Sequence, residues 1–179
     1  MTMLSPVPAS DPRVAPHNLE AEQSTLGGML LSQEAVAEVF EAVSGVDFYA
    51  PKHELIFNAI LSLFGKGEPT DVIAVSDELN KSGNLLKAGG ADYLHSLTSY
   101  VPTAANASYY AKIVSDKAIL RRLIDAGTRI AQSGYESQGE VEDLVNQAQA
   151  EVYKVSSMSS KEDYIGLSDS IEAAIQAVR

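Results

Sequence analysis

The stretch Val101-Pro102-Thr103-Ala104-Ala105-Asn106-Ala107-Ser108-Tyr109-Tyr110-Ala111-Lys112-Ile113-Val114 opens the longest periodic segment of this sequence. From it onward, apolar or small residues recur three or four positions apart as far as about Ser133, which is the spacing of one helix face. The members of this stripe are Tyr110, Ile113, Leu120, Ile124, Gly127 and Ala131, widened by Tyr109, Leu123 and Ile130. The sequence therefore predicts one long helix that starts near Pro102.

A second periodic segment follows a turn that is bracketed by Gly134 and Gly139. Its apolar positions are Val141, Leu144, Val145, Ala148, Val152 and Val155. Two helices with so short a connection must lie antiparallel as a hairpin. Ser137 and Glu140 have the spacing of a capping box at the start of the second helix. The longer first helix would overhang at its N-terminal end, and we expect the region before Pro102 to cover it.

The two arms of the expected hairpin differ in charge. Residues 104–134 carry five basic and two acidic side chains, whereas residues 135–158 carry five acidic side chains and one lysine. Opposite charge favours pairing of the arms within the chain or between subunits. The alternative is two solvated faces whose ion pairs contribute little.

Short helical segments separated by turn residues precede Pro102. We expect helices to start near Asn18, Ser32, Pro51 and Asp71, and a short fifth helix to carry Tyr93, Leu94 and Leu97 before ending near Val101. The pair Gly27-Gly28 inside the first helix costs helix stability, and this predicts the close approach of another helix.

The predicted fold is all-α, with a compact head of short helices, a long antiparallel helical hairpin, and then a linker helix. The expected segments are a flexible N-terminal arm (1–17), a globular helical head (18–101), the hairpin in the same domain (102–158), and a linker with the start of the linker helix (159–179). The last pattern is interrupted at Arg179, which suggests a piece of a longer protein. A helix so short needs a surface on which to dock.

Composition restricts the class of function. The chain has 179 residues, a formal charge of -11 and no cysteine, and no segment reads as a signal peptide or a membrane span. A protein that binds nucleic acid through phosphates needs the opposite charge balance. We therefore expect a cytoplasmic chain with protein partners, with no direct contact to nucleic acid and none to a membrane.

Motifs for catalysis are missing from the sequence. Gly65-Lys66-Gly67 lacks the spacing and the hydroxyl of a phosphate-binding loop, and no Gly-x-Ser-x-Gly elbow occurs. His17, His53 and His95 are far apart in the sequence, so surface or capping roles are expected rather than metal binding. We predict no catalytic, cofactor-binding or metal-binding residues.

Five segments in order resemble the N-terminal domain of the DnaB-type bacterial replicative DNA helicase. They are Leu19-Glu20-Ala21-Glu22-Gln23-Ser24-Thr25-Leu26-Gly27-Gly28; Asp47-Phe48-Tyr49 with His53 and Ile56-Phe57; Gly67-Glu68-Pro69-Thr70-Asp71; Gly89-Gly90-Ala91-Asp92-Tyr93-Leu94; and Val101-Pro102-Thr103-Ala104-Ala105-Asn106 with Tyr109-Tyr110-Ala111 and Ile113-Val114. The resemblance covers roughly residues 17 to 158.

This resemblance implies a collar domain that assembles as a trimer of dimers on a hexameric ring. The expected partners are further copies of the chain, the C-terminal domain of primase, and a helicase loader. ATP and Mg²⁺ belong to a motor domain that these residues lack, so the chain itself would not be an enzyme. The alternatives are a stand-alone helical adaptor or helicase-loading factor, and a small enzyme with an unrecognised site, which no spacing supports.

The resemblance also implies site residues. The primase-facing positions are Tyr93, Ile124 and Ile130, for each of which a core role is the alternative. The dimerisation positions on the hairpin are Ile113, Leu120, Leu123, Gly127, Leu144, Ala148 and Val152. The linker-helix docking positions are Ile171, Ile175 and Val178. We expect weak self-association of the isolated chain, as dimers.

Overall fold

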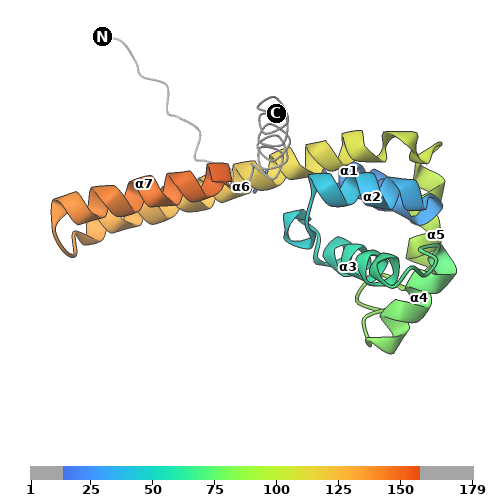
Figure 1. The fold of residues 1–179 in the computed structure, drawn as a ribbon. Helices are drawn as coiled ribbons and strands as arrows, with labels where there is room; N and C mark the ends of the chain where they lie inside the picture. Colours follow the sequence, from blue (N-terminus) through green and yellow to red (C-terminus); the bar gives the residue numbers. More distant parts are fainter. Residues whose placement is uncertain (1–13, 158–179) are drawn as a thin grey trace, which may run out of the picture.

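The computed structural model describes residues 14–157, and these residues form seven α-helices and two 3-10 turns (Figure 1). The helices are α1 (Leu19–Leu31), α2 (Gln33–Ala42), α3 (Pro51–Gly65), α4 (Val72–Lys81), α5 (Gly90–Tyr100), α6 (Ala107–Glu136) and α7 (Val141–Ser157), and the turns are Gly45–Asp47 and Ala104–Asn106. No strand occurs within residues 14–157, and the all-α prediction is confirmed. The docking positions Ile171, Ile175 and Val178 lie outside the described residues.

Figure 1 shows a head built from α1 to α5 and a hairpin built from α6 and α7. α6 begins against the head and continues beyond it, and α7 turns back along its outer part. At 1.5 Å per residue, the 30 residues of α6 span about 45 Å and the 17 residues of α7 about 25 Å. The longer helix is thus shared by the two parts of the molecule.

Side-chain caps start three helices of the head where the sequence predicts them. The side chains of Asn18, Ser32 and Asp71 accept hydrogen bonds from the backbone amides three residues further on, at 2.9, 3.3 and 2.9 Å. Each bond satisfies an amide that has no partner within its helix. These starts are therefore determined locally by the sequence.

The glycine pair of α1 allows two close helix crossings. A Cβ added to Gly27 would collide with the carbonyl of Leu97 on α5, and one added to Gly28 would lie 2.7 Å from the Cβ of Ala107 on α6. The predicted close approach at Gly27-Gly28 is confirmed. Because α1 touches both α5 and α6, it lies at the centre of the head.

The face of α6 that packs on the head differs from the predicted stripe. Small residues, spaced three or four apart, are buried there: Ala107, Ala111, Val114 and Ala118. Leu120, Leu123 and Ile124 from the predicted stripe remain 42, 50 and 51% exposed. The crossing with Gly28 of α1 requires a small side chain at Ala107, so size as well as hydrophobicity decides which residues of α6 are buried.

The ends of the hairpin helices also differ from prediction. α6 begins at Ala107 rather than near Pro102, because a 3-10 turn occupies Ala104–Asn106, and it continues through Gly134 to Glu136. Ser137 ends α6 in the left-handed conformation (φ 50°), and its amide donates to the carbonyl of Ser133. The capping box predicted from Ser137 and Glu140 is therefore wrong.

Candidate functional site

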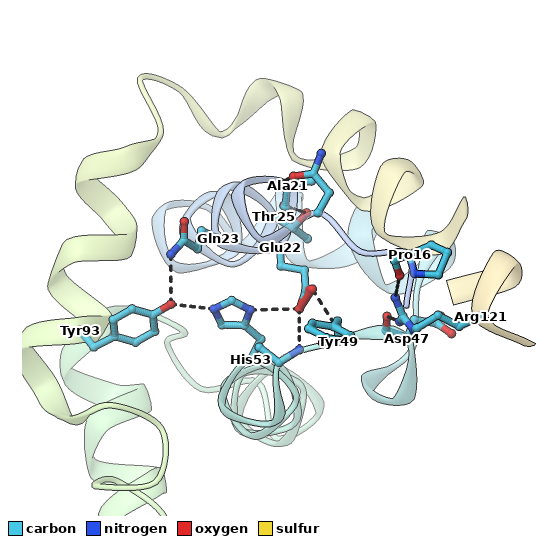
Figure 2. A network of polar contacts seen from close by, with 12 residues as sticks. Pro16, Ala21, Glu22, Gln23, Thr25, Asp47, Tyr49, His53, Tyr93 and Arg121 are labelled. Atoms are coloured by element: carbon cyan, nitrogen blue, oxygen red, sulfur yellow. Dashed lines mark hydrogen bonds and ion pairs between the residues drawn. The ribbon is translucent and has the colours of Figure 1, made fainter. Parts of the chain in front are cut away.

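Tyr93 is half-buried on α5, and its hydroxyl points into the head (Figure 2). The hydroxyl oxygen lies 2.6 Å from Nε2 of His53 on α3. The amide nitrogen of Gln23 on α1 donates to the same oxygen at 3.4 Å. Tyr93 therefore connects its helix to two others through one polar atom.

Glu22 contacts His53 at the ring nitrogen that does not face Tyr93. Its Oε1 lies 3.0 Å from Nδ1 of His53, and its two oxygens accept from the backbone amides of Tyr49 and Ala50, each at 3.2 Å. Glu22 and His53 are 2% and 1% exposed. The surface or capping role predicted for His53 is wrong, and Glu22 accepts from the amides of the last two residues before α3.

The ring of Tyr93 is held as closely as its hydroxyl. The ammonium of Lys52 lies 3.8 Å from the ring centroid. A Cβ on Gly89 would lie 2.8 Å from Cγ of Tyr93, and Gly89 has a φ of 101° that favours glycine. Contact with the Tyr93 ring and a positive φ therefore explain why the first residue of the Gly-Gly-x-x-Tyr-Leu segment is glycine.

A second polar cluster joins the head to α6. Oδ1 of Asp47 accepts from Arg122 at 2.7 Å, while Oδ2 accepts from the amide and hydroxyl of Ser44 at 2.9 and 3.2 Å. Arg121 donates to the carbonyls of Asp47 and Pro16, at 2.5 and 2.7 Å. Two successive arginines of α6 thereby fix the turn before α3 and the chain before α1.

Sequence reasoning missed these two clusters, although every member is visible in the sequence. Glu22 and His53 are 31 residues apart, and Asp47 and Arg122 are 75 apart. Nothing in local periodicity reports such distant pairs. The one available signal was Arg121-Arg122, a charged pair that interrupts the small-residue face of α6.

The outer surface of the hairpin exposes apolar side chains on both helices. On α6 these are Leu120, Leu123 and Ile124, and on α7 they are Val141, Val145 and Val152, at 76, 51 and 51% exposure. We call these six residues the hairpin face. Ile130 of α6 lies next to it, in an open groove lined with Val145, Ala148, Gln149 and Val152.

The structure places the predicted site residues in two separate regions. Tyr93 belongs to the head, whereas Ile124 and Ile130 belong to the part of α6 beyond it. Ile113 packs against the core of the head, and Leu144 and Ala148 are half-buried. Gly127 is exposed, and no neighbouring atom would lie within 4 Å of a Cβ added to it. The close helix contact expected at Gly127, in the hairpin or in a dimer, is therefore not made within the described hairpin, and a dimer contact stays a prediction.

One of the ion pairs between described residues links the two arms of the hairpin. Arg129 donates to Glu151 through Nε and Nη2 at 3.0 and 2.9 Å. These hydrogen bonds, with the charge of Arg129, hold the pKa of Glu151 below its usual value. Other basic residues of α6 contact groups outside α7: Lys112 pairs with Asp116 at 3.4 Å, and Arg121 and Arg122 bond the head.

Residues 14–157 contain neither a cluster of metal-binding side chains nor a membrane-spanning helix. Within that range, no group of three or more histidine, aspartate or glutamate side chains is arranged to hold a metal ion. The same residues include no helix with both the length and the apolar character needed to cross a membrane.

A helical head that carries a hairpin with an exposed apolar face has the character of a protein-interaction domain. The family model described as "DnaB-like helicase N terminal domain" matches residues 14–116, more than half of the chain. The chain therefore belongs to the DnaB-like helicase N-terminal domain family. This finding agrees with the resemblance found in the sequence.

Related proteins support this membership. The chain is 62% identical over 169 residues to "Replicative DNA helicase DnaB" of Leifsonia xyli, covering 94% of this chain and 37% of that protein. It is 51% identical over 162 residues to "Replicative DNA helicase DnaB" of Mycobacterium leprae, covering 89% and 27%. The chain thus spans about a third of the length of the curated relatives that it matches.

Solved structures show the same fold. The crystal structure of the N-terminal domain of DnaB helicase from Mycobacterium tuberculosis matches with a TM-score of 0.75 and 55% identity, covering 79% of this chain and 99% of that one. A DnaB-like replicative helicase, solved in a study of its interactions with primase, matches with a TM-score of 0.65 and 22% identity, covering 87% and 35%. The second likeness concerns the fold alone.

Proposed function

We propose that this chain is the collar domain of a replicative DNA helicase, which joins helicase subunits and recruits primase. The observation that carries the proposal is the hairpin face, an apolar surface on two helices that is exposed within residues 14–157. Exposed apolar surface of this kind is typical of protein-interaction sites. Family membership makes a second copy of the chain the first candidate to cover it.

Self-association through the hairpin face has a direct physical reason. α7 packs mainly on α6, and none of its side chains is fully buried within the described part of the chain. A pair of helices with one narrow contact gains little stability from packing. Two hairpins that bring their apolar faces together would bury those side chains from water.

Recruitment of primase is proposed through Tyr93, Ile124 and Ile130. Ile124 also belongs to the hairpin face, so contact with primase there needs a part of that face that a second hairpin leaves uncovered. Aromatic and large aliphatic side chains are suitable anchors for a helix of a partner protein. A distant relative with this fold was solved in a study of its interactions with primase, which makes primase the partner to test first.

The rest of the proposed function concerns the whole protein. Its relatives are replicative DNA helicases, and this chain matches about a third of their length. Unwinding of DNA with ATP and Mg²⁺ is therefore assigned to a motor domain outside these residues. We also propose that the whole protein contacts a helicase loader and is located in the cytoplasm.

The test is calorimetric titration of the chain with the C-terminal domain of the cognate primase. We expect Tyr93→Ala to weaken binding by about tenfold or more, because an aromatic anchor is lost. The matched control is Tyr100→Ala, since Tyr100 lies on the same helix and is 59% exposed. Binding that survives Tyr93→Ala removes Tyr93 from the surface, and no binding by the unaltered chain overturns the recruitment role.

A further inference from the structure

The hydrogen bonds that connect Glu22, His53 and Tyr93 all run in one direction, from donor to acceptor. The carboxylate of Glu22 faces the backbone amides of Tyr49 and Ala50, which can only donate. Glu22 therefore acts as an acceptor at both oxygens, and Nδ1 of His53, 3.0 Å from Oε1, must carry the hydrogen between them. The tautomer follows from these partners.

The same tautomer decides what the hydroxyl of Tyr93 does. In a neutral imidazole with its hydrogen on Nδ1, Nε2 is an acceptor. The Tyr93 hydroxyl, 2.6 Å away, then donates its hydrogen to His53. Gln23 donates toward the same oxygen. The hydroxyl hydrogen of Tyr93 therefore points into the head and is not available to another acceptor.

The surroundings of the ring restrict Tyr93 further. The Lys52 ammonium lies over the ring, and Gly89 leaves no space for a Cβ beneath it. Figure 2 shows Tyr93, His53 and Glu22 in line between α5 and α1. With its hydroxyl engaged and its ring held, half-buried Tyr93 offers other molecules the exposed part of its aromatic ring.

We propose that Glu22 and His53 are positioning residues for Tyr93. They hold its hydroxyl as an inward donor, so that a partner protein meets the ring with an aliphatic or aromatic side chain and not with a hydrogen-bond acceptor. This inference rests on the proposed function, in which Tyr93 contacts primase. It adds two buried residues and the chemistry of the contact to that surface.

Two substitutions at His53 separate the two ends of the polar chain. His53→Asn places an amide near the position of Nδ1, so it keeps a donor for Glu22 and removes the acceptor for Tyr93. His53→Gln places an amide oxygen near the position of Nε2, so it keeps an acceptor for Tyr93 and removes the donor for Glu22. A merely structural role would make the two variants equivalent for binding.

The experiment measures affinity for the primase C-terminal domain. We expect Tyr93→Phe and His53→Asn each to weaken binding by about fivefold, the effect of one lost hydrogen bond. We expect His53→Gln to weaken it by less than about twofold. Tyr93→Phe should add nothing to His53→Asn, because both remove the same bond.

Several results would overturn the inference. Additive effects of Tyr93→Phe and His53→Asn would mean that the hydroxyl bonds the partner directly. Equal losses from His53→Asn and His53→Gln would mean that His53 only maintains the fold. Thermal unfolding of each variant shows whether the head is still folded.

Nitrogen NMR of the His53 ring in the unaltered chain provides a readout that needs no partner. We expect the hydrogen on Nδ1 alone, and any hydrogen on Nε2 would overturn the inference even if primase binds. If the unaltered chain does not bind primase, the recruitment role fails and the partner contact fails with it. The ring measurement then decides separately whether the chain holds Tyr93 as described.

Discussion

Nη1 of Arg122 lies 2.7 Å from Oδ1 of Asp47, and this ion pair joins the middle of α6 to the turn before α3. The two side chains are 23% and 9% exposed, so the pair is largely removed from water. Arg121, the preceding residue, bonds the carbonyl of Asp47 as well. The position of the hairpin relative to the head therefore depends on a few polar contacts in addition to apolar packing.

The first prediction concerns this pair. Arg122→Met keeps much of the packing but leaves the Asp47 carboxylate without its guanidinium partner, and we expect a loss of about 2 kcal/mol in the free energy of unfolding. Urea denaturation measures the change. Lys112→Met is the matched control, since Lys112 pairs with Asp116 on the surface of the same helix at 73 and 57% exposure. It should change stability by less than about 0.5 kcal/mol; equal effects would contradict the role given to Arg122.

The second prediction compares two glycines in helices. Gly28→Ala adds a methyl group that would lie 2.7 Å from Ala107, and we expect it to destabilise the head by about 1–3 kcal/mol. Gly134→Ala adds the same methyl group to α6 where nothing lies within 4 Å, and we expect a gain of about 0.5–1 kcal/mol. Denaturation midpoints of the two variants should shift in opposite directions. Shifts of the same sign would contradict the close crossing of α1 and α6.

The third prediction tests the hairpin face. Gly127 is exposed and shares its helix stripe with Leu120 and Ile124, so Gly127→Leu should hold a second hairpin away and weaken self-association. Sedimentation velocity over a range of concentrations measures the monomer–dimer equilibrium. Gly65→Leu is the control, because Gly65 ends α3 in the head and also has open space around it. Unchanged dimerisation of Gly127→Leu would remove Gly127 from the interface.

The fourth prediction concerns pH. Hydrogen bonds from Arg129 lower the pKa of Glu151 in the folded chain, so folding favours the ionised carboxylate. The resulting stabilisation is present above the pKa of the unfolded chain and is lost as pH falls through the lower, folded value. NMR titration of the Glu151 carboxyl should give a lower midpoint in the unaltered chain than in Arg129→Gln. Lys112→Gln should leave that midpoint unchanged. Equal midpoints in the unaltered chain and in Arg129→Gln would contradict the pairing of the two arms.

Local features of this fold could be predicted from the sequence, because their causes lie within a few residues of each other. Asn18, Ser32 and Asp71 bond amides three residues away, so a capping residue before an apolar run is enough to place each helix start. The close packing at Gly27-Gly28 was predictable because glycine inside a helix is costly without such a contact. The hairpin followed from two periodic segments with a short connection.

Features that depend on distant partners could not be predicted. Periodicity assigned the large residues of α6, such as Leu120 and Ile124, to the covered face, but the residues buried on the head are alanine and valine. At the first of them, Ala107, the crossing with Gly28 of α1 leaves no space for a larger side chain. The sequence predicted a surface or capping role for His53 because no local pattern brings a carboxylate to an imidazole 31 residues away. The positions proposed for primase contact came from resemblance, and they stay predictions.

α6 runs through the head and the hairpin as one uninterrupted helix of 30 residues. A continuous helix resists bending over this length, and the ion pair between Asp47 and Arg122 fixes α6 to the head near the midpoint of the helix. Any sideways push at the tip, where α7 begins, is transmitted as torque to the alanine-lined end beneath α1. A force on the tip of the hairpin would therefore also act on the packing of α6 against the head.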